Sequence, residues 1–533
     1  MKKLHIALAA IAALSLSSCN DWLKEEAPGT NRLDDFFTSG AVAIQTVNAC
    51  YAPVAWEYNP GGYFSEWYIG DIASDDALKG GQDVADDANA YDIDNFKVNI
   101  QNGILLNYYR AKYQGIIRCN LALQEVAKVE PDEHMTEARK DCLLGEAYFM
   151  RALYYFQLVR VFGGVPMIDF VIDSSSAWQQ PRATADEVYN HIISDLKEAE
   201  NRLWNKSAYP ATDLGRATKG AAQAMLCKVY LYMKEYSDAY DWGKLWVNEQ
   251  YGKEYRLMAD YEQNFTLAGE NGSESVFEIQ YMEDPTSDYG EGFGFSRGTF
   301  SSILCRPRAS EFGGKSSNKG WGFNHPTQNL LDEFENGDPR RDLTVGQLDA
   351  EISQEVEVNY LGNPYYNYKL SYLEAGLIPS LSHDSRGPLN YRLMRASDVL
   401  LLFAEAALES GKSTADAKWA LEEVRARARA MASDAGVLPA FPYGSYADNT
   451  DGLRQAIRHE RRVELGMEGH RWFDLVRWGI AYEVLNKDNG TYAAHESDEV
   501  RAEMANFIKG KNELFPIPSE EINLNPMEQN PGY

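Results

Sequence analysis

The sequence is short of positive charge, and this shortage narrows the range of possible partners. Its 533 residues include 51 Lys and Arg but 79 Asp and Glu, which gives a net charge of −28. Nucleic-acid binding relies on Lys and Arg to neutralise phosphates, so this balance argues against a nucleic-acid partner. A neutral ligand, or a partner with a basic face, fits the charge better.

Closely spaced cysteines are also missing. The six cysteines are Cys19, Cys50, Cys119, Cys142, Cys227 and Cys305. They form no CxxC pair and have no His at metal-ligand spacing, so we expect no zinc site. Cys19 belongs to the N-terminal leader, where it is the cysteine of a lipobox-like motif. We expect the others to be buried free thiols, although an oxidising compartment would also permit a disulfide.

The sequence lacks the motifs of common catalytic sites: there is no GxSxG, no HExxH and no P-loop. A glycosidase needs two carboxylates about 5 to 9 Å apart, one of them with a raised pKa. The candidate pairs are Asp75 with Asp76, Asp86 with Asp87, and Glu460 with Glu464. Adjacent aspartates point in different directions, and the third pair lies among arginines that would keep both groups ionised. We therefore predict that the protein is not an enzyme.

Residues 1–18 have the pattern of a signal peptide. Two lysines precede an apolar run over residues 4–14, which is shorter than the roughly 20 residues of a membrane-spanning helix. The run ends in LSSC, residues 16–19, which resembles the lipobox of bacterial lipoproteins. Cleavage there would leave Cys19 as a lipidated N-terminus that anchors the chain, followed by a tether over residues 19–30. An ordinary secretory signal is the alternative.

Apolar residues recur at three- and four-residue intervals through much of the remaining chain, residues 31–533, which we interpret as a single domain. This spacing predicts helices in residues 41–56, 105–129, 137–162, 185–203, 215–251 and 396–428. The pairs read as helical hairpins, and their alternation of small and large residues resembles a tetratricopeptide repeat. The predicted fold class is therefore mainly α, with tetratricopeptide-like hairpins separated by long irregular or short-strand insertions. We place these insertions at about 61–103, 252–330 and 343–392.

Residues 458–479, which we call the charged joint, combine alternating charges with large aromatic residues. Their sequence is RHERRVELGMEGHRWFDLVRWG. Opposite charges recur at the spacing where helical side chains meet. Gly466 and Gly469 interrupt the pattern, so we predict two helices that meet at a tight, buried joint.

The charged joint also carries a family resemblance. Residues 460–479 resemble the C-terminal signature of the SusD/RagB family, cell-surface glycan-binding lipoproteins of Bacteroidetes. Three further segments resemble the same family: GEAYFMRALYYFQLVRVFGGVPMI (145–168), YRLMRASDVLLLFAEAALESG (391–411) and LFPIPSEEINLNPMEQNPGY (514–533). The resemblance implies an outer-membrane lipoprotein that faces the cell exterior. It also implies a SusC-like TonB-dependent transporter as partner, to which a captured oligosaccharide or polysaccharide is delivered.

Two of the insertions mix aromatic residues with polar ones, as a sugar-binding surface does. Sugar rings stack on aromatic planes, while their hydroxyls need polar donors and acceptors. The residues that we predict to contact ligand are Trp67, Tyr68, Asp75, Asp76, Tyr91, Asn95, Tyr281, Tyr289, Phe293, Arg297 and Trp321. The family resemblance points to these two regions, and the individual residues are our own predictions.

Two alternatives stay open. Residues 83–95, DVADDANAYDIDN, offer clustered oxygen ligands that could hold calcium. They do not match the EF-hand spacing, so we interpret them as a solvated acidic loop and predict no cofactor. The second alternative concerns function: the helical repeats could bind a peptide or protein ligand instead of a sugar.

Overall fold

The computed structural model describes most of the chain from Phe36 to Tyr533. The described residues are 36–59, 62–172, 179–283, 298–308, 319–348, 361, 363–371, 387–434, 436–488, 490–504 and 507–533. Cys19 and the predicted signal peptide lie outside these residues. Within the described ranges, none of the helices combines the length and the apolar character needed to cross a membrane.

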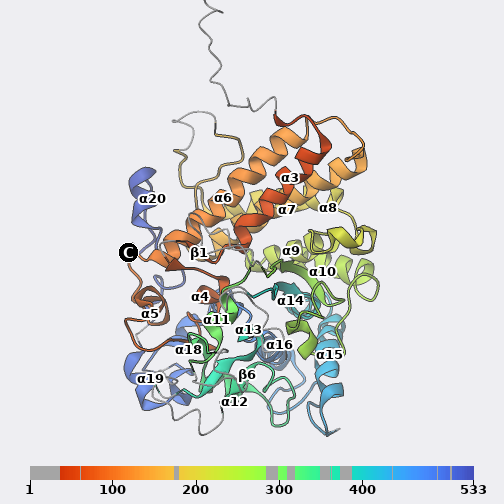
Figure 1. Ribbon diagram of the computed structural model, residues 1–533. Coiled ribbons are helices and arrows are strands. Elements are labelled where there is room, and N and C mark those ends of the chain that lie inside the picture. Colours follow the sequence, from red (N-terminus) through yellow and green to blue (C-terminus); the bar gives the residue numbers. More distant parts are fainter. Residues whose placement is uncertain are drawn as a thin grey trace, which may run out of the picture.

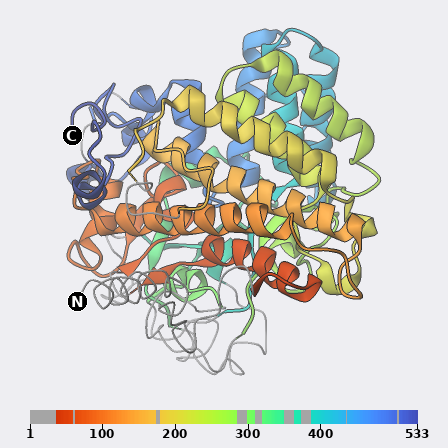
Figure 2. The same cartoon turned by 90° about the horizontal axis from the view of Figure 1, so that it is seen from above.

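Long helices arranged in a curved row form the scaffold (Figures 1 and 2). They are α3 (Gly40–Tyr51), α6 (Gly103–Val126), α7 (Glu137–Phe162), α8 (Ala185–Arg202), α9 (Lys219–Tyr232), α10 (Tyr236–Glu249), α14 (Ala396–Glu409) and α15 (Thr414–Met431). From α6 onward, each helix packs on the next one in the row. The mainly-α fold of helical hairpins is thus confirmed.

Local sequence explains where these helices start and stop. Thr184 begins α8 with a capping box, in which its hydroxyl accepts from the Glu187 amide while the Glu187 side chain accepts from the Thr184 amide. Asn102 and Thr136 cap α6 and α7 in the same way, with a side-chain oxygen that accepts a backbone N–H. Gly163 ends α7 at a φ of 71°, a left-handed conformation that favours glycine.

Small residues allow the helices to approach closely. In α6, a Cβ built on Gly115 would lie 2.2 Å from the Tyr154 ring of α7, so only glycine fits there. Ala221, Ala222 and Ala224 of α9 are fully buried. The described cysteines, Cys50, Cys119, Cys142, Cys227 and Cys305, are free thiols buried in this core, as the sequence predicted.

The insertions contain more regular structure than the sequence suggested. Short antiparallel pairs join β1 (Tyr58–Asn59) to β2 (Gly62–Tyr63), β3 (Ala77–Gly80) to β5 (Phe323–Pro326), β4 (Ser275–Ile279) to β8 (Tyr391–Arg395), and β6 (Val345–Gln347) to β7 (Tyr365–Asn367). Short helices lie between them: α4 (Glu66–Gly70), α5 (Ala88–Asp94), α11 (Ser301–Cys305), α12 (Gln328–Glu333) and α13 (Tyr368–Ser371). Two more short helices, α18 (Ala481–Leu485) and α19 (Asp498–Glu503), lie near the C-terminus. Residues 61–103, predicted as an insertion of irregular structure or short strands, thus contain short strands and also the helices α4 and α5.

The charged joint consists of two helices, as predicted. α16 (Thr450–Leu465) ends at Gly466, and α17 (Arg471–Trp478) starts after a turn in which Gly469 has a φ of 76°. The first insertion packs directly on this turn, because a Cβ on Gly70 would lie 2.1 Å from the Gly469 carbonyl oxygen. Trp472 and Phe473 are buried beneath the turn.

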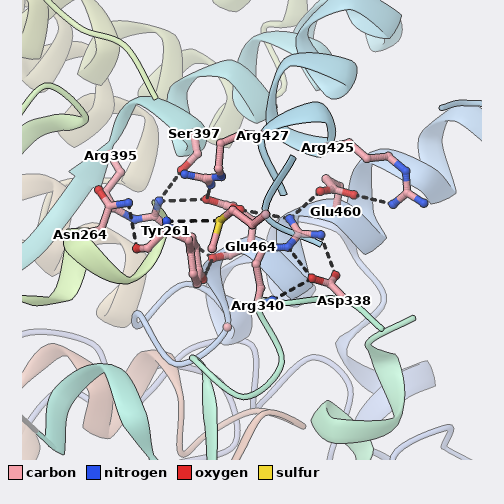
Figure 3. Close-up of polar contacts among 12 residues, drawn as sticks. Tyr261, Asn264, Asp338, Arg340, Arg395, Ser397, Arg425, Arg427, Glu460 and Glu464 are labelled. Carbon is pink, nitrogen blue, oxygen red and sulfur yellow. Dashed lines mark hydrogen bonds and ion pairs between the residues drawn. The ribbon is translucent and has the colours of Figure 1, made fainter. Parts of the chain in front are cut away.

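Buried arginines from three other segments converge on α16 (Figure 3). Glu464 accepts hydrogen bonds from Arg340 at 3.1 Å, Arg395 at 2.9 Å and Arg427 at 2.5 Å. Burial alone would raise the pKa of Glu464, but these arginines hold it well below its usual value. Glu460 pairs with Arg340 at 2.6 Å, which links the two glutamates through one guanidinium. The ion network thus fastens the insertions to the last helices of the scaffold.

The C-terminal segment lies over the helical scaffold (Figure 1). The Phe515 amide donates to the Val161 carbonyl at 2.9 Å, and Ile517 is fully buried. This segment contains a short helix, α20 (Ser519–Leu524).

Candidate ligand-binding site

Two predicted aromatic contacts of the first insertion, Trp67 and Tyr68, and one of the second, Tyr281, are buried. Trp67 and Tyr68, on α4, have no exposed surface, and their rings stack with centroids 3.9 Å apart. Trp67 donates from Nε1 to the Ser301 hydroxyl at 2.9 Å. Tyr281 is 8% exposed. The expectation that these three rings contact ligand is corrected: α4, which carries Trp67 and Tyr68, packs into the core, and Tyr281, which follows strand β4, is buried as well.

Asp75 and Asp76 bind arginines of the charged joint. Arg471 binds both carboxylate oxygens of Asp75, at 2.7 and 2.9 Å, and Arg462 donates to Asp76 at 2.8 Å. Burial would raise the pKa of Asp75, but the two arginines lower it to about 2. Both carboxylates are almost fully buried, which corrects the expectation that they line a ligand surface. They tie the first insertion to α16 and α17.

Tyr91 lies on α5 and Asn95 directly follows it. Both belong to residues 83–95, the acidic stretch with oxygen ligands that could hold calcium. The Tyr91 hydroxyl donates to Glu503 at 2.8 Å, and the Asn95 amide donates to the Tyr91 carbonyl. Asn95 is buried and Tyr91 is half-buried. The stretch folds around the Lys79 ammonium, which donates to the carbonyls of Asp83 and Asp86. Among the described residues, no group of three His, Cys, Asp or Glu is placed to hold a metal ion.

Tyr289, Phe293 and Arg297 lie outside the described residues. Of the predicted contacts in the second insertion, Trp321 is the one that is described and half-buried at the surface. Its indole packs edge-on against Tyr63, with ring centroids 5.4 Å apart.

Trp321 is part of a cluster that we call the aromatic ridge: Tyr58, Tyr63, Phe300 and Trp321. Tyr58 and Tyr63 face each other across the β1–β2 pair at 5.0 Å, and Phe300 lies below both at 5.7 and 5.6 Å. Phe300 is buried, whereas the other three rings are half-buried. The ridge therefore presents partly exposed ring surface on a rigid base.

One carboxylate, that of Glu57, holds the two insertions together beneath the ridge. Its Oε1 accepts from the hydroxyls of Ser65 at 3.0 Å and Ser301 at 2.5 Å. Its Oε2 accepts from the Thr299 hydroxyl at 2.8 Å and the Phe300 amide at 2.7 Å. These donors are neutral and come from segments more than 200 residues apart in sequence. Within the described part of the chain, Glu57 thus links these segments through hydrogen bonds and not through an ion pair.

Polar groups lie next to the ridge. Arg308 is half-buried and donates to Asp86 at 3.3 Å and to the Gln82 side chain at 3.2 Å. The same guanidinium approaches the Trp321 carbonyl at 3.5 Å. The ridge is thus bordered by the Gln82 side-chain amide and by the Arg308–Asp86 pair, whose charges compensate each other. These groups suit a neutral ligand with many hydroxyl groups.

Comparisons with known proteins show the family of the chain. The model of the SusD family matches residues 353–533, and a model described as starch-binding and associating with the outer membrane matches residues 74–231. Together they cover more than half of the chain. The chain belongs to the SusD/RagB family.

Relatives extend this match over the full length. SusD-like protein P2 of Formosa agariphila is 28% identical over 100% of both chains. A solved laminarin binding SusD-like protein has a TM-score of 0.76 at 28% identity, covering 93% of this chain and 100% of its own. The fold is also shared by surface glycan-binding protein A from Bacteroides thetaiotaomicron in complex with laminarihexaose, with a TM-score of 0.75 at 24% identity over 92% and 100% of the chains. The SusD/RagB family is thus one of glycan-binding proteins.

Tyr58 and Tyr63 were not among the predicted contacts, although the sequence contains a signal for their pairing. Residues 58–63 read YNPGGY, two tyrosines that flank a turn-forming Asn-Pro-Gly-Gly. Such turns join antiparallel strands and place the flanking residues opposite each other, which is how Tyr58 pairs with Tyr63. In this SusD/RagB protein, the hairpin rather than the following helix carries the partly exposed rings.

Proposed function

We propose that this SusD/RagB protein binds an oligosaccharide or polysaccharide across the aromatic ridge. The observation that supports this most directly is the set of half-buried rings of Tyr58, Tyr63 and Trp321. Tyr58 and Tyr63 pack on Phe300, whose amide is bound by Glu57, and Trp321 packs on Tyr63. Sugar rings gain from stacking on such planes because their C–H faces are apolar. The solved relative that is named for laminarin binding makes laminarin the first polymer to test.

The test is a calorimetric titration of the chain without its leader against a panel of polysaccharides that includes laminarin and starch. Trp321→Ala should weaken binding of the best polymer about tenfold, since an aromatic contact contributes roughly 0.5–1.5 kcal/mol beyond the apolar area that it buries. Trp242→Ala is the matched control, because Trp242 is also half-buried but lies on α10. No binding across the whole panel, or equal losses in the two variants, would contradict the proposal.

The proposal includes delivery to a SusC-like TonB-dependent transporter by a protein that is lipid-anchored through Cys19 and faces the cell exterior. It is supported by the LSSC leader motif and by the family model described as associating with the outer membrane. A tether of this kind raises the effective concentration of captured ligand near a transporter. Cys19→Ala should abolish acylation and release the protein from the membrane fraction, which labelling with a radioactive fatty acid would measure.

The proposal assigns no catalytic role to the chain. The Glu460 and Glu464 carboxylates are buried among arginines, and a general acid needs a proton that Glu464 does not hold at neutral pH. Incubation of the protein with the polymer it binds best should therefore release no reducing ends.

A further inference from the structure

A surface cleft lies between α3, the loop of residues 211–216 and strand β4. We call it the α3 cleft. Its volume is about 230 Å³. Pockets for drug-sized ligands measure roughly 300–1,000 Å³, so this cleft has room for one ring rather than for a whole oligosaccharide.

The α3 cleft is apolar on its floor and polar at its mouth. Val54, Ala55, Leu214 and Ile279 supply the apolar surface, and Leu214 remains 47% exposed. Asn48 is exposed at the mouth, and its side chain makes no hydrogen bond within the described part of the chain. The cleft therefore offers an apolar plane together with an amide that is available to a ligand.

The charges around the α3 cleft are compensated by the protein itself. Arg216 donates to Glu146 at 2.9 Å and pairs with Asp213 at 3.2 Å. Glu278 pairs with Arg392 at 3.5 Å. A charged ligand would find no opposite charge without a partner here, so the chemistry selects a neutral group with an apolar face and hydroxyl groups, which describes a sugar ring.

The α3 cleft and the aromatic ridge are neighbours along the chain. Ala55 lines the cleft and Tyr58 belongs to the ridge, so their Cα atoms are at most about 11 Å apart, three steps of 3.8 Å. Trp56 lies between them, half-buried, with its ring 5.1 Å from the Arg118 guanidinium. A six-unit oligosaccharide is long enough to reach both.

We propose that the α3 cleft is a second saccharide subsite, which takes one further ring of an oligosaccharide bound on the aromatic ridge. This inference rests on the proposed function. It predicts that affinity depends on chain length, because only a longer ligand reaches from the ridge into the cleft.

The experiment compares laminarihexaose with laminaribiose in calorimetric titrations. The native chain should bind the hexasaccharide more tightly than the disaccharide. Leu214→Ala should weaken hexasaccharide binding about five-fold by removing apolar contact, and should leave disaccharide binding unchanged. Leu524→Ala is the matched control, because Leu524 is 52% exposed on α20 and does not line the cleft. Asn48→Trp, which fills the cleft from an exposed position on α3, should have at least the effect of Leu214→Ala.

Each outcome decides the inference. It is overturned if both cleft variants keep the native preference for the longer ligand, or if they lose affinity for the two lengths equally. It is also overturned if the native chain does not bind laminarihexaose. The proposed function, in contrast, falls only if the whole polysaccharide panel gives no binding.

Discussion

The charged joint and the aromatic ridge both connect segments that are far apart in the sequence, but they use different chemistry. In the joint, Glu464 is buried and bound by three arginines. Below the ridge, Glu57 is equally enclosed but is bound by hydroxyls and one amide. In the joint, positively charged arginines neutralise the Glu464 carboxylate. At the ridge, no arginine among the described residues contacts the Glu57 carboxylate directly.

This difference separates a scaffold from a surface. A buried ion network gains its stability from complete enclosure, so the side chains that form it are not accessible to a ligand. The ridge needs only its base to be enclosed, and its upper rings remain partly exposed. Asp75 shows the consequence: a residue type suited to sugar binding is taken up by the joint, where Arg471 binds both of its oxygens.

The largest effect should come from removing the central charge of the joint. Glu464→Gln leaves the guanidiniums of Arg340, Arg395 and Arg427 without their shared anion, which should lower the free energy of unfolding by about 3–5 kcal/mol. Urea denaturation would measure the loss. Glu499→Gln, at an exposed position on α19, is the control and should change little. A loss as small as that of the control would mean that the network contributes nothing to stability.

Glu57→Gln, the equivalent change at the ridge, should lower stability less than Glu464→Gln does and should weaken polysaccharide binding more. Glu57→Gln replaces one acceptor oxygen by an amide donor, which leaves at least one of the partners unsatisfied. We expect a loss of about 2 kcal/mol in the free energy of unfolding, together with weaker binding of the polysaccharide. Glu464→Gln should bind normally per folded molecule. If the two variants behaved alike in binding, the distinction between scaffold and surface would not hold.

A smaller effect is expected for the buried tryptophan of the first insertion. Trp67→Phe keeps an aromatic ring but removes the Nε1 donor to Ser301, so the free energy of unfolding should fall by about 1 kcal/mol. Affinity should stay at the native value, because Trp67 has no exposed surface. A tenfold loss of affinity, as expected for Trp321→Ala, would instead indicate that Trp67 contacts the ligand.

A further effect concerns pH and a histidine of the joint. Burial alone would lower the pKa of His459, but Glu333 and Glu335 raise it to about 9. The folded chain therefore keeps a proton that the unfolded chain loses near pH 6.5, so this stabilisation is complete below pH 6.5 and is lost as pH rises through 9. Tm should fall by a few degrees from pH 6.5 to 9, measured by calorimetry. In His459→Gln the fall over this range should be smaller, and an unchanged fall would assign it to other groups.

Sequence reasoning identified the scaffold well because its evidence is local. The helices over 137–162 and 185–203 follow from apolar spacing and from caps such as Thr184, which act within a few residues. The tight joint at Gly466 and Gly469 follows from glycine interrupting a helical pattern. The family resemblance rested on residues 145–168, 391–411, 460–479 and 514–533, and is confirmed by the matched models.

The ligand-binding residues were harder to predict because exposure is not a local property. Trp67 and Trp321 each stand in a glycine-rich, aromatic stretch, and nothing in either stretch reveals which ring is covered. That is decided by Ser301, which lies 234 residues from Trp67 and binds its indole, and by Tyr63, which supports Trp321 from the side.

The sequence by itself determined the helical scaffold, the acidic charge and the membership of a glycan-binding family. These depend on periodicity, composition and motifs, which can be read from neighbouring residues. Only the tertiary structure decided which carboxylates become partners of buried arginines and which rings remain at the surface. The physical reason is that burial and ion pairing arise from contacts between distant segments, such as Arg462 with Asp76 and Glu57 with Phe300.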